Sequence, residues 1–513
     1  MAVVTPVSHD RPLSPSMLRS GLSSVTLAAL GLVLGFVSVP VMVAGLGYAG
    51  YGVYSIAFTV AGYGAVLDLG FGWAGMKFAA EAHAQRDRDA VAGVLWALVL
   101  HQTLVGAVVV VLLTAAADRA GPWLMGGAGG DAARVAGLLP TAGVWFALSG
   151  LNGVFVGILR GAQRYVAAAV VAGTALVIGV GGGALVVAWG HGLHAAAGCQ
   201  VLGALAAALV GAGALRGYLL PAPRGRLISA SVRELRRMLT FSLWALLARL
   251  VQLVMLQGDK VVAARTAGAL GLPSYVVPFN VAQRLNALGS AAVTAVYPVA
   301  AGHHRSGRVF HESYFWAARV VHLCTAAPAI TLVVLAPLFL HSWIGPEMAA
   351  GGAGFLRVLA VGYWIVSVAS VEAGCLEGWG HPRLTALAAT GGLIAAAVVA
   401  ALLALTEGGL WAVAGGVGAW MTVTGLLTTI AWYRVSGFPA ARLWRALLRP
   451  IGEMAVTGAV LGELAGGWVT PGPGGLLACG ALVVLLFAYG LVRIFPGEER
   501  RRLLGRVAGL ARA

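Results

Sequence analysis

Long apolar runs recur along almost the whole 513-residue chain, and they restrict the fold more than any other feature. A helix needs about 20 apolar residues to cross the hydrocarbon core of a bilayer. Runs of about this length lie near 22–44, 52–75, 90–114, 135–158, 166–189, 196–219, 241–258, 275–300, 320–341, 355–377, 384–405, 410–433, 451–470 and 475–494. Only 10% of the residues are charged, which is too few to cover a water-soluble protein of this size. We therefore expect an all-α integral membrane protein with about 14 transmembrane helices.

The distribution of lysine and arginine predicts the orientation of these helices. With both termini in the cytosol, 27 of the 34 basic residues fall in cytosolic segments. Cytosolic loops of membrane proteins are enriched in lysine and arginine, so this orientation is strongly favoured. The same asymmetry explains the net charge of +16 without any nucleic-acid partner.

Loop lengths and composition predict the domain organisation. We expect a cytosolic tail at 1–20, an N-terminal lobe of six helices at 21–219, and a C-terminal lobe of six helices at 241–433. A basic cytosolic loop at 220–240 separates the lobes. Helices 13 and 14 occupy 434–494, and a basic cytosolic tail follows at 495–513.

A repeated pattern relates the two lobes. The spacing of Gly47, Gly50, Tyr54 and Phe58 recurs at Gly268, Gly271, Tyr275 and Phe279, an offset of 221. Gly157 and Gly161 recur at Gly374 and Gly378, an offset of 217. Both lobes enter the membrane from the cytosol, so we expect parallel repeats around a central cavity, as in many secondary transporters. The alternative is a coincidence of glycine-rich composition.

Motifs for enzymatic chemistry are missing from the sequence. Neither of the two lysines lies in a phosphate-binding GxxxxGK[ST] loop, and no GxSxG or HExxH motif occurs. The four cysteines are isolated in apolar segments, which argues against a disulfide framework or a thiolate metal site. We expect a transporter that is not an enzyme, with no metal and no cofactor.

Polar residues within the apolar runs are the candidate site residues, because they are costly in lipid and usually face a cavity or a partner. At helical spacing, the seventh run carries Ser242, Arg249, Gln252 and Asp259, and the eighth carries Asn280, Gln283, Arg284 and Thr294. Asp68 interrupts the second run, and Glu372 and Glu377 lie near the inner end of the tenth.

Two interpretations of these residues remain open. Arginine offers forked hydrogen bonds to phosphate, so one interpretation is a cationic wall for an anionic substrate. Its members would be Arg249, Arg284, Gln252, Asn280 and Gln283. The other is structural pairing of arginine with aspartate or glutamate between helices. Asp68, Asp259 and Glu372 are candidates for binding a coupling proton or sodium ion, and the same structural alternative applies to them.

Four stretches resemble a known family. They are GLGYAGYGVYSIAFTVAGYGAVLDLGFGWAGMKFAAE at 45–81, GILRGAQRY at 157–165, SYVVPFNVAQRLNALGSAAVTAVYPVAAG at 274–302 and LEGWGHPR at 376–383. They look like recurring segments of the Wzx-type lipid-linked oligosaccharide flippases of the multidrug/oligosaccharidyl-lipid/polysaccharide (MOP) exporter superfamily. The last two helices carry no segment that matches.

The resemblance implies a MATE-like fold of two six-helix lobes around a central cavity. It also implies transfer of undecaprenyl-diphosphate-linked glycans across the bacterial plasma membrane by alternating access, in export of a surface polysaccharide. Partners would be the lipid-linked glycan, the bilayer and the polysaccharide polymerase or export machinery.

Three other functions remain alternatives. A cation-coupled multidrug efflux pump has the same fold, but its cavity should be acidic, whereas Arg249 and Arg284 are basic. A flippase for a peptidoglycan-precursor lipid is chemically close. A membrane-embedded glycosyltransferase or polymerase would need a larger loop for its active site than any in this sequence.

Overall fold

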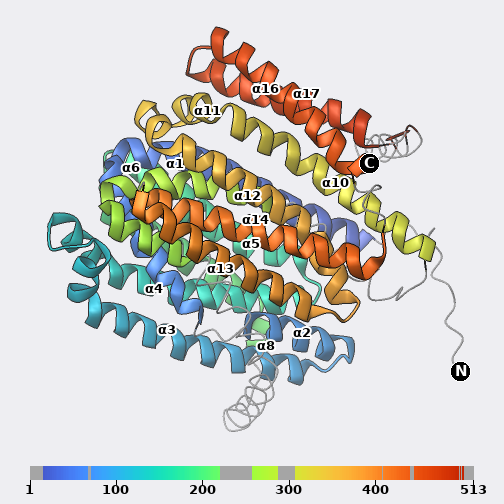
Figure 1. Cartoon of the computed structure of the whole chain (residues 1–513). Coiled ribbons are helices and arrows are strands. Elements are labelled where there is room, and N and C mark those ends of the chain that lie inside the picture. Colours follow the sequence, from blue (N-terminus) through green and yellow to red (C-terminus); the bar gives the residue numbers. More distant parts are fainter. Residues whose placement is uncertain are drawn as a thin grey trace, which may run out of the picture. The chain divides into compact units, whose positions relative to one another are not determined.

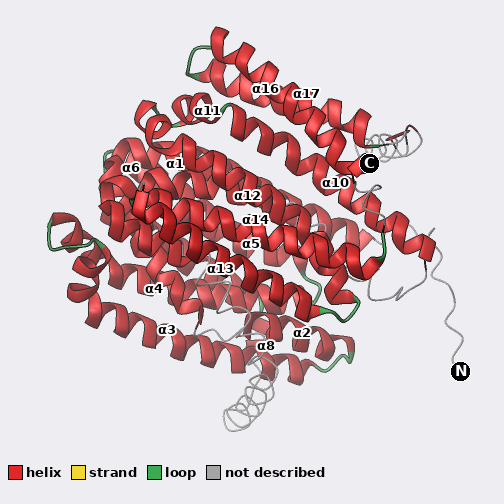
Figure 2. Cartoon of the chain, viewed as in Figure 1, coloured by secondary structure: helices red, strands yellow, loops and turns green. Residues whose placement is uncertain are grey.

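The computed structural model describes residues 15–66, 71–219, 257–286, 307–406, 408–438, 444–495, 497 and 500–501. Within these residues all regular structure is helical, and no strand occurs (Figure 2). The chain divides into two compact units at residues 261 and 262. The expected inter-lobe loop at 220–240 lies outside the described residues, as do 1–14 and most of 495–513.

The first unit contains the elements coloured from blue to green in Figure 1. They are α1 (Pro15–Gly62), the 3-10 turn η1 (Tyr63–Val66), α2 (Phe71–Ala84), α3 (Arg88–Leu124), α4 (Gly130–Gly161), α5 (Tyr165–Ala175), the π-helical η2 (Leu176–Gly181), α6 (Gly182–Ala188), α7 (Leu193–Ala214) and α8 (Arg216–Leu219). The helix α4 packs against α3, α7 and α2, and a buried apolar core forms between α2, α3, α4, α5 and α7.

The second unit begins within a helix at residues 257–286. Its other elements are α10 (Gly307–Val334), α11 (Ala336–Trp343), α12 (Pro346–Gly378), α13 (Pro382–Thr406), α14 (Gly409–Ser436), η3 (Trp444–Leu448), α16 (Arg449–Trp468) and α17 (Pro473–Ile494). Its core lies between α10, α12, α14, α16 and α17. The last two expected helices therefore belong to this core, packed on α10.

Ten of the described helices are long and apolar enough to cross a membrane. They include the continuous segment formed by α5, η2 and α6, and they confirm the expectation of an all-α, multi-pass protein. The expected span at 241–258 lies almost entirely outside the described residues. The helices at 257–286 and α16 are described but are not among the ten.

The expected second span differs from the structure in one detail. Instead of one helix over 52–75, residues 48–62 continue α1, η1 follows, and α2 begins at Phe71. Glycines at positions 62, 64, 70 and 72 surround this interruption, and glycine weakens a helix interior because its backbone loses most entropy on folding.

Both copies of the sequence repeat break a helix at the same glycine. Gly47 interrupts α1 with φ of 71°, and Gly268 interrupts the helix at 257–286 with φ of 64°. A residue with a Cβ is strained in this left-handed conformation, so glycine is favoured at both positions.

Aromatic contacts after the break also recur. Tyr54 lies 4.8 Å from Phe58 between ring centroids, and Tyr275 lies 5.9 Å from Phe279. Phe58 then meets Trp145 of α4 edge-on, at 5.1 Å and 80°. In the second unit, Phe279 meets Tyr363 of α12 at 5.6 Å and 80°.

The turns that follow α4 and α12 have matching hydrogen bonds. In the first, Gln163 has φ of 58° and its N–H donates to Arg160 O, while Arg164 N–H donates to Leu159 O. In the second, Gly380 has φ of 79° and its N–H donates to Glu377 O, while His381 N–H donates to Leu376 O. Each residue of the first turn corresponds to the residue 217 positions later in the second turn. The two units therefore contain the same turn, one after α4 and the other after α12.

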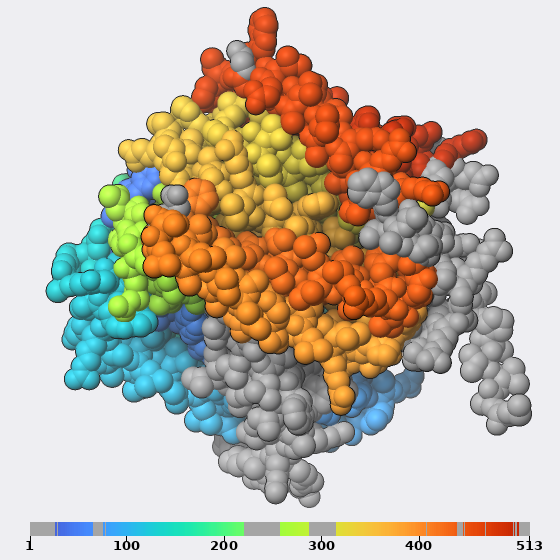
Figure 3. All heavy atoms as spheres, in the orientation of Figure 1, coloured from blue at the N-terminus to red at the C-terminus, as the bar shows by residue number. Residues whose placement is uncertain are grey.

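Outward apolar side chains and close helix crossings both suit a lipid environment. The helices α13 and α14 pack against each other and form one continuous surface, drawn in orange in Figure 3. Leu402 and Leu405 of α13 and Ile430 of α14 are exposed. In the first unit, a Cβ on Gly203 of α7 would lie only 2.5 Å from Gly179 N of η2. Small residues allow such approaches, which is the usual way that helices pack in membranes.

Candidate functional site

Glu372 is a buried carboxylate within the second unit. It lies in α12 with 3% of its surface exposed. Tyr314 of α10 donates a hydrogen bond of 3.1 Å to Oε1, and Thr429 of α14 donates one to Oε2. Each carboxylate oxygen therefore accepts one hydrogen bond from a hydroxyl group. Among the described residues, no basic side chain forms an ion pair with Glu372.

Aromatic rings pack around Tyr314, which donates a hydrogen bond to this carboxylate. The ring of Tyr314 lies 5.2 Å from Trp432 and 5.5 Å from Phe438, and Trp432 lies 4.9 Å from Trp379. Tyr433 of α14 is 3.5 Å from Tyr314 between hydroxyl oxygens. The site is thus a small polar cluster in an apolar surround, where a carboxylate has few groups with which to share its charge.

Asp259 occupies a different environment in the first unit. Its Oδ1 lies 3.6 Å from the Nζ of Lys260, and both side chains are buried. An oppositely charged neighbour favours the structural-pairing interpretation for this aspartate. Lys260 is close enough to pair with it, and the expected pairing with an arginine stays a prediction, because Arg249 lies outside the described residues.

The other described candidates lie near the end of the helix at 257–286. Asn280 and Gln283 are half-buried, and Arg284 is exposed. No hydrogen bond or ion pair among the described residues joins these three side chains to one another. Arg249, Gln252 and Asp68 lie outside the described residues, and so do Ser242 and Thr294.

An apolar cavity of about 450 Å³ lies beside η1 and the end of α1 in the first unit. Its lining comes from α1, η1, α3 and residue 261, namely Val60, Tyr63, Gly64, Val109, Leu112, Leu113, Ala120, Trp123, Leu124 and Val261. Among these lining residues only Tyr63 and Trp123 have a polar side-chain atom, so the cavity suits an apolar chain better than a headgroup. Among the described residues, no cluster of three or more His, Cys, Asp or Glu side chains could hold a metal ion.

Comparison with known sequences identifies the family. Residues 17–304 match the family described as Polysaccharide biosynthesis protein, which is more than half of the chain. The chain belongs to the polysaccharide biosynthesis protein family. No curated protein matches the sequence significantly.

Solved structures similar to this family member are flippases and transporters. A Lipid II flippase MurJ in an inward closed conformation matches with a TM-score of 0.68 at 11% identity, covering 92% of this chain and 98% of MurJ. An inward-facing multidrug resistance MATE transporter of the MOP superfamily matches with 0.57 at 19% identity, covering 82% and 98%. A MOP superfamily transporter from Pyrococcus furiosus matches with 0.55 at 17% identity, covering 83% and 99%.

These likenesses confirm the expected fold. The family member is a multi-pass membrane protein with the fold of MOP superfamily flippases and transporters.

Sequence reasoning found Glu372 but missed the groups that surround it. Tyr314 and Thr429 come from helices 58 and 57 residues away in the chain. Hydroxyl residues are common in membrane helices, so nothing local marks these two as partners. The sequence did offer one weaker signal: Thr429 and Tyr433 are spaced i and i+4, which places two hydroxyl groups on the same face of a helix.

Proposed function

We propose that the chain translocates an undecaprenyl-diphosphate-linked oligosaccharide from the cytosolic to the outer leaflet of a bacterial plasma membrane, for export of a surface polysaccharide. The family match over 17–304 carries this proposal, and the likeness to a Lipid II flippase over 92% of the chain supports it. Both termini lie in the cytosol in this proposal, in agreement with the distribution of basic residues. The polysaccharide polymerase or export machinery would take up the product.

Alternating access would move the glycan headgroup while the prenyl tail stays in lipid. The diphosphate would be held by Arg249 and Arg284, with Gln252, Asn280 and Gln283 beside them. An unpaired arginine at a helix centre costs about 2.5–3.5 kcal/mol on translocon scales. Arg249 is near the middle of the expected span at 241–258, so an anionic substrate would offset that cost there. Replacing both arginines by alanine should abolish transport, and lysine should restore only part of it, because an ammonium group lacks the forked donor geometry. Arg119→Ala, an exposed arginine in α3, is the matched control.

Glu372 is the residue that would couple transport to a proton or sodium gradient. Its burial, its two hydroxyl donors and the lack of an ion pair with a described basic residue support this assignment. Asp68 remains a candidate for the same role. Asp259 is a weaker one, because Lys260 already lies beside it.

The decisive experiment is deletion of the gene, followed by labelling of lipid-linked glycans from each side of the membrane. Accumulation of the glycan in the cytosolic leaflet, reversed by the wild-type gene, would support the flippase. Unchanged sidedness together with altered resistance to amphipathic drugs would support an efflux pump and contradict the proposal.

A second candidate is a flippase for the peptidoglycan-precursor lipid. The observation in its favour is the share of this chain that each solved structure covers. The Lipid II flippase MurJ covers 92% of it, more than the 82–83% that the MATE transporters cover. The same deletion strain separates the two candidates, because the accumulating lipid would carry a peptidoglycan precursor instead of a polysaccharide repeat unit.

A further inference from the structure

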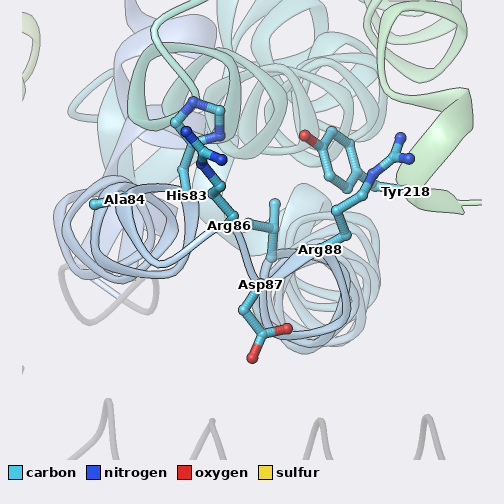
Figure 4. A pocket seen from close by; sticks show the side chains of 7 residues that line it. His83, Ala84, Arg86, Asp87, Arg88 and Tyr218 are labelled. Atoms are coloured by element: carbon cyan, nitrogen blue, oxygen red, sulfur yellow. The ribbon is translucent and has the colours of Figure 1, made fainter.

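A hollow of about 580 Å³ lies at one end of the first unit, where α2 and α3 meet (Figure 4). It is lined by the end of α2 and the turn after it (His83, Ala84, Arg86, Asp87), by the start of α3 (Arg88, Val91), and by Tyr218 of α8. Pockets that hold small ligands commonly have volumes of about 300–1,000 Å³. The hollow is therefore large enough for a headgroup.

The charges around this hollow are not balanced locally. Among the described residues of the lining, Asp87 is the only acid, and its Oδ1 accepts a hydrogen bond of 2.9 Å from Ala90 N at the start of α3. Figure 4 shows its carboxylate directed away from both guanidinium groups. Among the described residues, neither Arg86 nor Arg88 forms an ion pair with a carboxylate.

Arg88 and Arg86 approach the hollow from its two sides. The guanidinium of Arg88 lies 5.7 Å from the centre of the Tyr218 ring, a cation–π distance that limits its motion. Arg86 has φ of 58°, an uncommon conformation for a residue with a side chain, and lies next to His83 in Figure 4. The Tyr218 hydroxyl points into the space between these groups.

We propose that this hollow is a binding site for a phosphate or diphosphate group, separate from the polar residues inside the membrane helices. Two guanidinium groups supply forked donors, and the tyrosine hydroxyl and the imidazole supply further donors of the kind that phosphate oxygens accept. The site lies where the apolar span Arg88–Leu124 begins, on the side that the basic residues predict to be cytosolic. The group can come from the headgroup of an anionic membrane lipid or from a soluble phosphate, because both present the same oxygens.

The test measures binding directly, so it can fail while the proposed transport function stands, and the reverse also holds. The purified full-length protein is placed in phosphatidylcholine nanodiscs with or without phosphatidic acid, and bound lipids are counted by native mass spectrometry. Inorganic pyrophosphate is titrated against the same samples at constant ionic strength, with thermal stability as the readout.

The variant is Arg86→Gln with Arg88→Gln, and the control is Arg119→Gln with Arg383→Gln. Gln163 already adopts φ of 58° in the equivalent turn after α4, so glutamine at position 86 should keep the backbone. Both control arginines are exposed, and each lies on a membrane helix. The two variants therefore lose the same charge, and only the first loses it from the hollow.

We expect the Arg86/Arg88 variant to bind phosphatidic acid or pyrophosphate at least about tenfold more weakly than the wild type and the control. Retained phosphatidic acid that pyrophosphate displaces would identify a lipid headgroup as the ligand. Stabilisation by pyrophosphate without retained lipid would identify a soluble phosphate. Tyr218→Phe should weaken binding less than Tyr218→Leu, because phenylalanine keeps the ring under Arg88. Equal binding by the wild type and the Arg86/Arg88 variant, or equal loss in the control, would overturn the proposal.

Discussion

The hydroxyl of Tyr314 in α10 donates a hydrogen bond of 3.1 Å to the carboxylate of Glu372 in α12. Thr429 of α14 donates to the other carboxylate oxygen, so three helices of the second unit meet at one acid. Buried polar networks of this kind hold helices in a defined register. Loss of one partner is costly in free energy, because it leaves a buried polar atom without a hydrogen bond.

Substitutions at Glu372 should separate structure from transport. Glu372→Gln should retain near-normal thermal stability, because its amide oxygen can still accept a hydroxyl hydrogen bond. Glu372→Ala should lose about 1–3 kcal/mol, because a buried hydroxyl is left without an acceptor. If Glu372 carries the coupling ion, transport by Glu372→Gln should no longer respond to an imposed proton or sodium gradient. Transport that responds to both gradients as the wild type does would remove Glu372 from the coupling mechanism.

The glycines at the two helix breaks should not tolerate a side chain. We expect Gly47→Ala and Gly268→Ala each to destabilise the protein by about 1–2 kcal/mol, because an L-residue is strained at positive φ. Thermal unfolding in detergent measures the effect. Gly153→Ala is the control: it lies in α4, and nothing lies within 4 Å of an added Cβ. Equal melting temperatures for Gly47→Ala and Gly153→Ala would contradict the strain argument.

Two glycines in α3 should respond in opposite directions. A Cβ at Gly121 would lie 2.3 Å from Ala132 O of α4, whereas a Cβ at Gly93 meets nothing within 4 Å. Gly121→Ala should therefore cost about 1–3 kcal/mol through displacement of the α3–α4 crossing. Gly93→Ala should be neutral or stabilising by up to about 1 kcal/mol, because alanine favours the helix. Equal destabilisation by both would show that the crossing does not determine the effect.

Orientation is tested by cysteine labelling. In a variant without Cys199, Cys324, Cys375 and Cys479, a cysteine at Ser229 should react with an impermeant reagent only after the cells are opened. A cysteine at His191, in the turn before α7, should react in intact cells. The reverse pattern would invert the orientation and would move the Arg86/Arg88 hollow to the outer face.

Much of the fold follows from the sequence because the bilayer imposes a simple length rule. The apolar run near 135–158 became α4 (Gly130–Gly161), and the run near 384–405 became α13 (Pro382–Thr406). The break at η1 did not follow, because hydropathy continues across residues 52–75 while the backbone depends on local glycines and packing. The recurrence of Gly47 at Gly268 was visible as spacing, and the structure shows that both positions share a positive φ.

Composition and spacing along the chain predict the helical class, the approximate spans and the repeat spacing, because the bilayer and the chain direction constrain them directly. The sidedness that the basic residues favour stays a prediction. Each of these features depends on composition or on residues close together in the chain.

Which side chains contact one another depends on the tertiary structure. Glu372 was recognisable as an intramembrane acid, but its contacts with Tyr314 and Thr429 depend on how three helices pack. Asp259 was a candidate of the same kind as Glu372, and its neighbour Lys260 was visible in the sequence. The structure adds that both side chains are buried and 3.6 Å apart. Likewise, the contact between Arg88 and Tyr218 of α8 depends on packing in three dimensions, because the two residues are far apart in the chain.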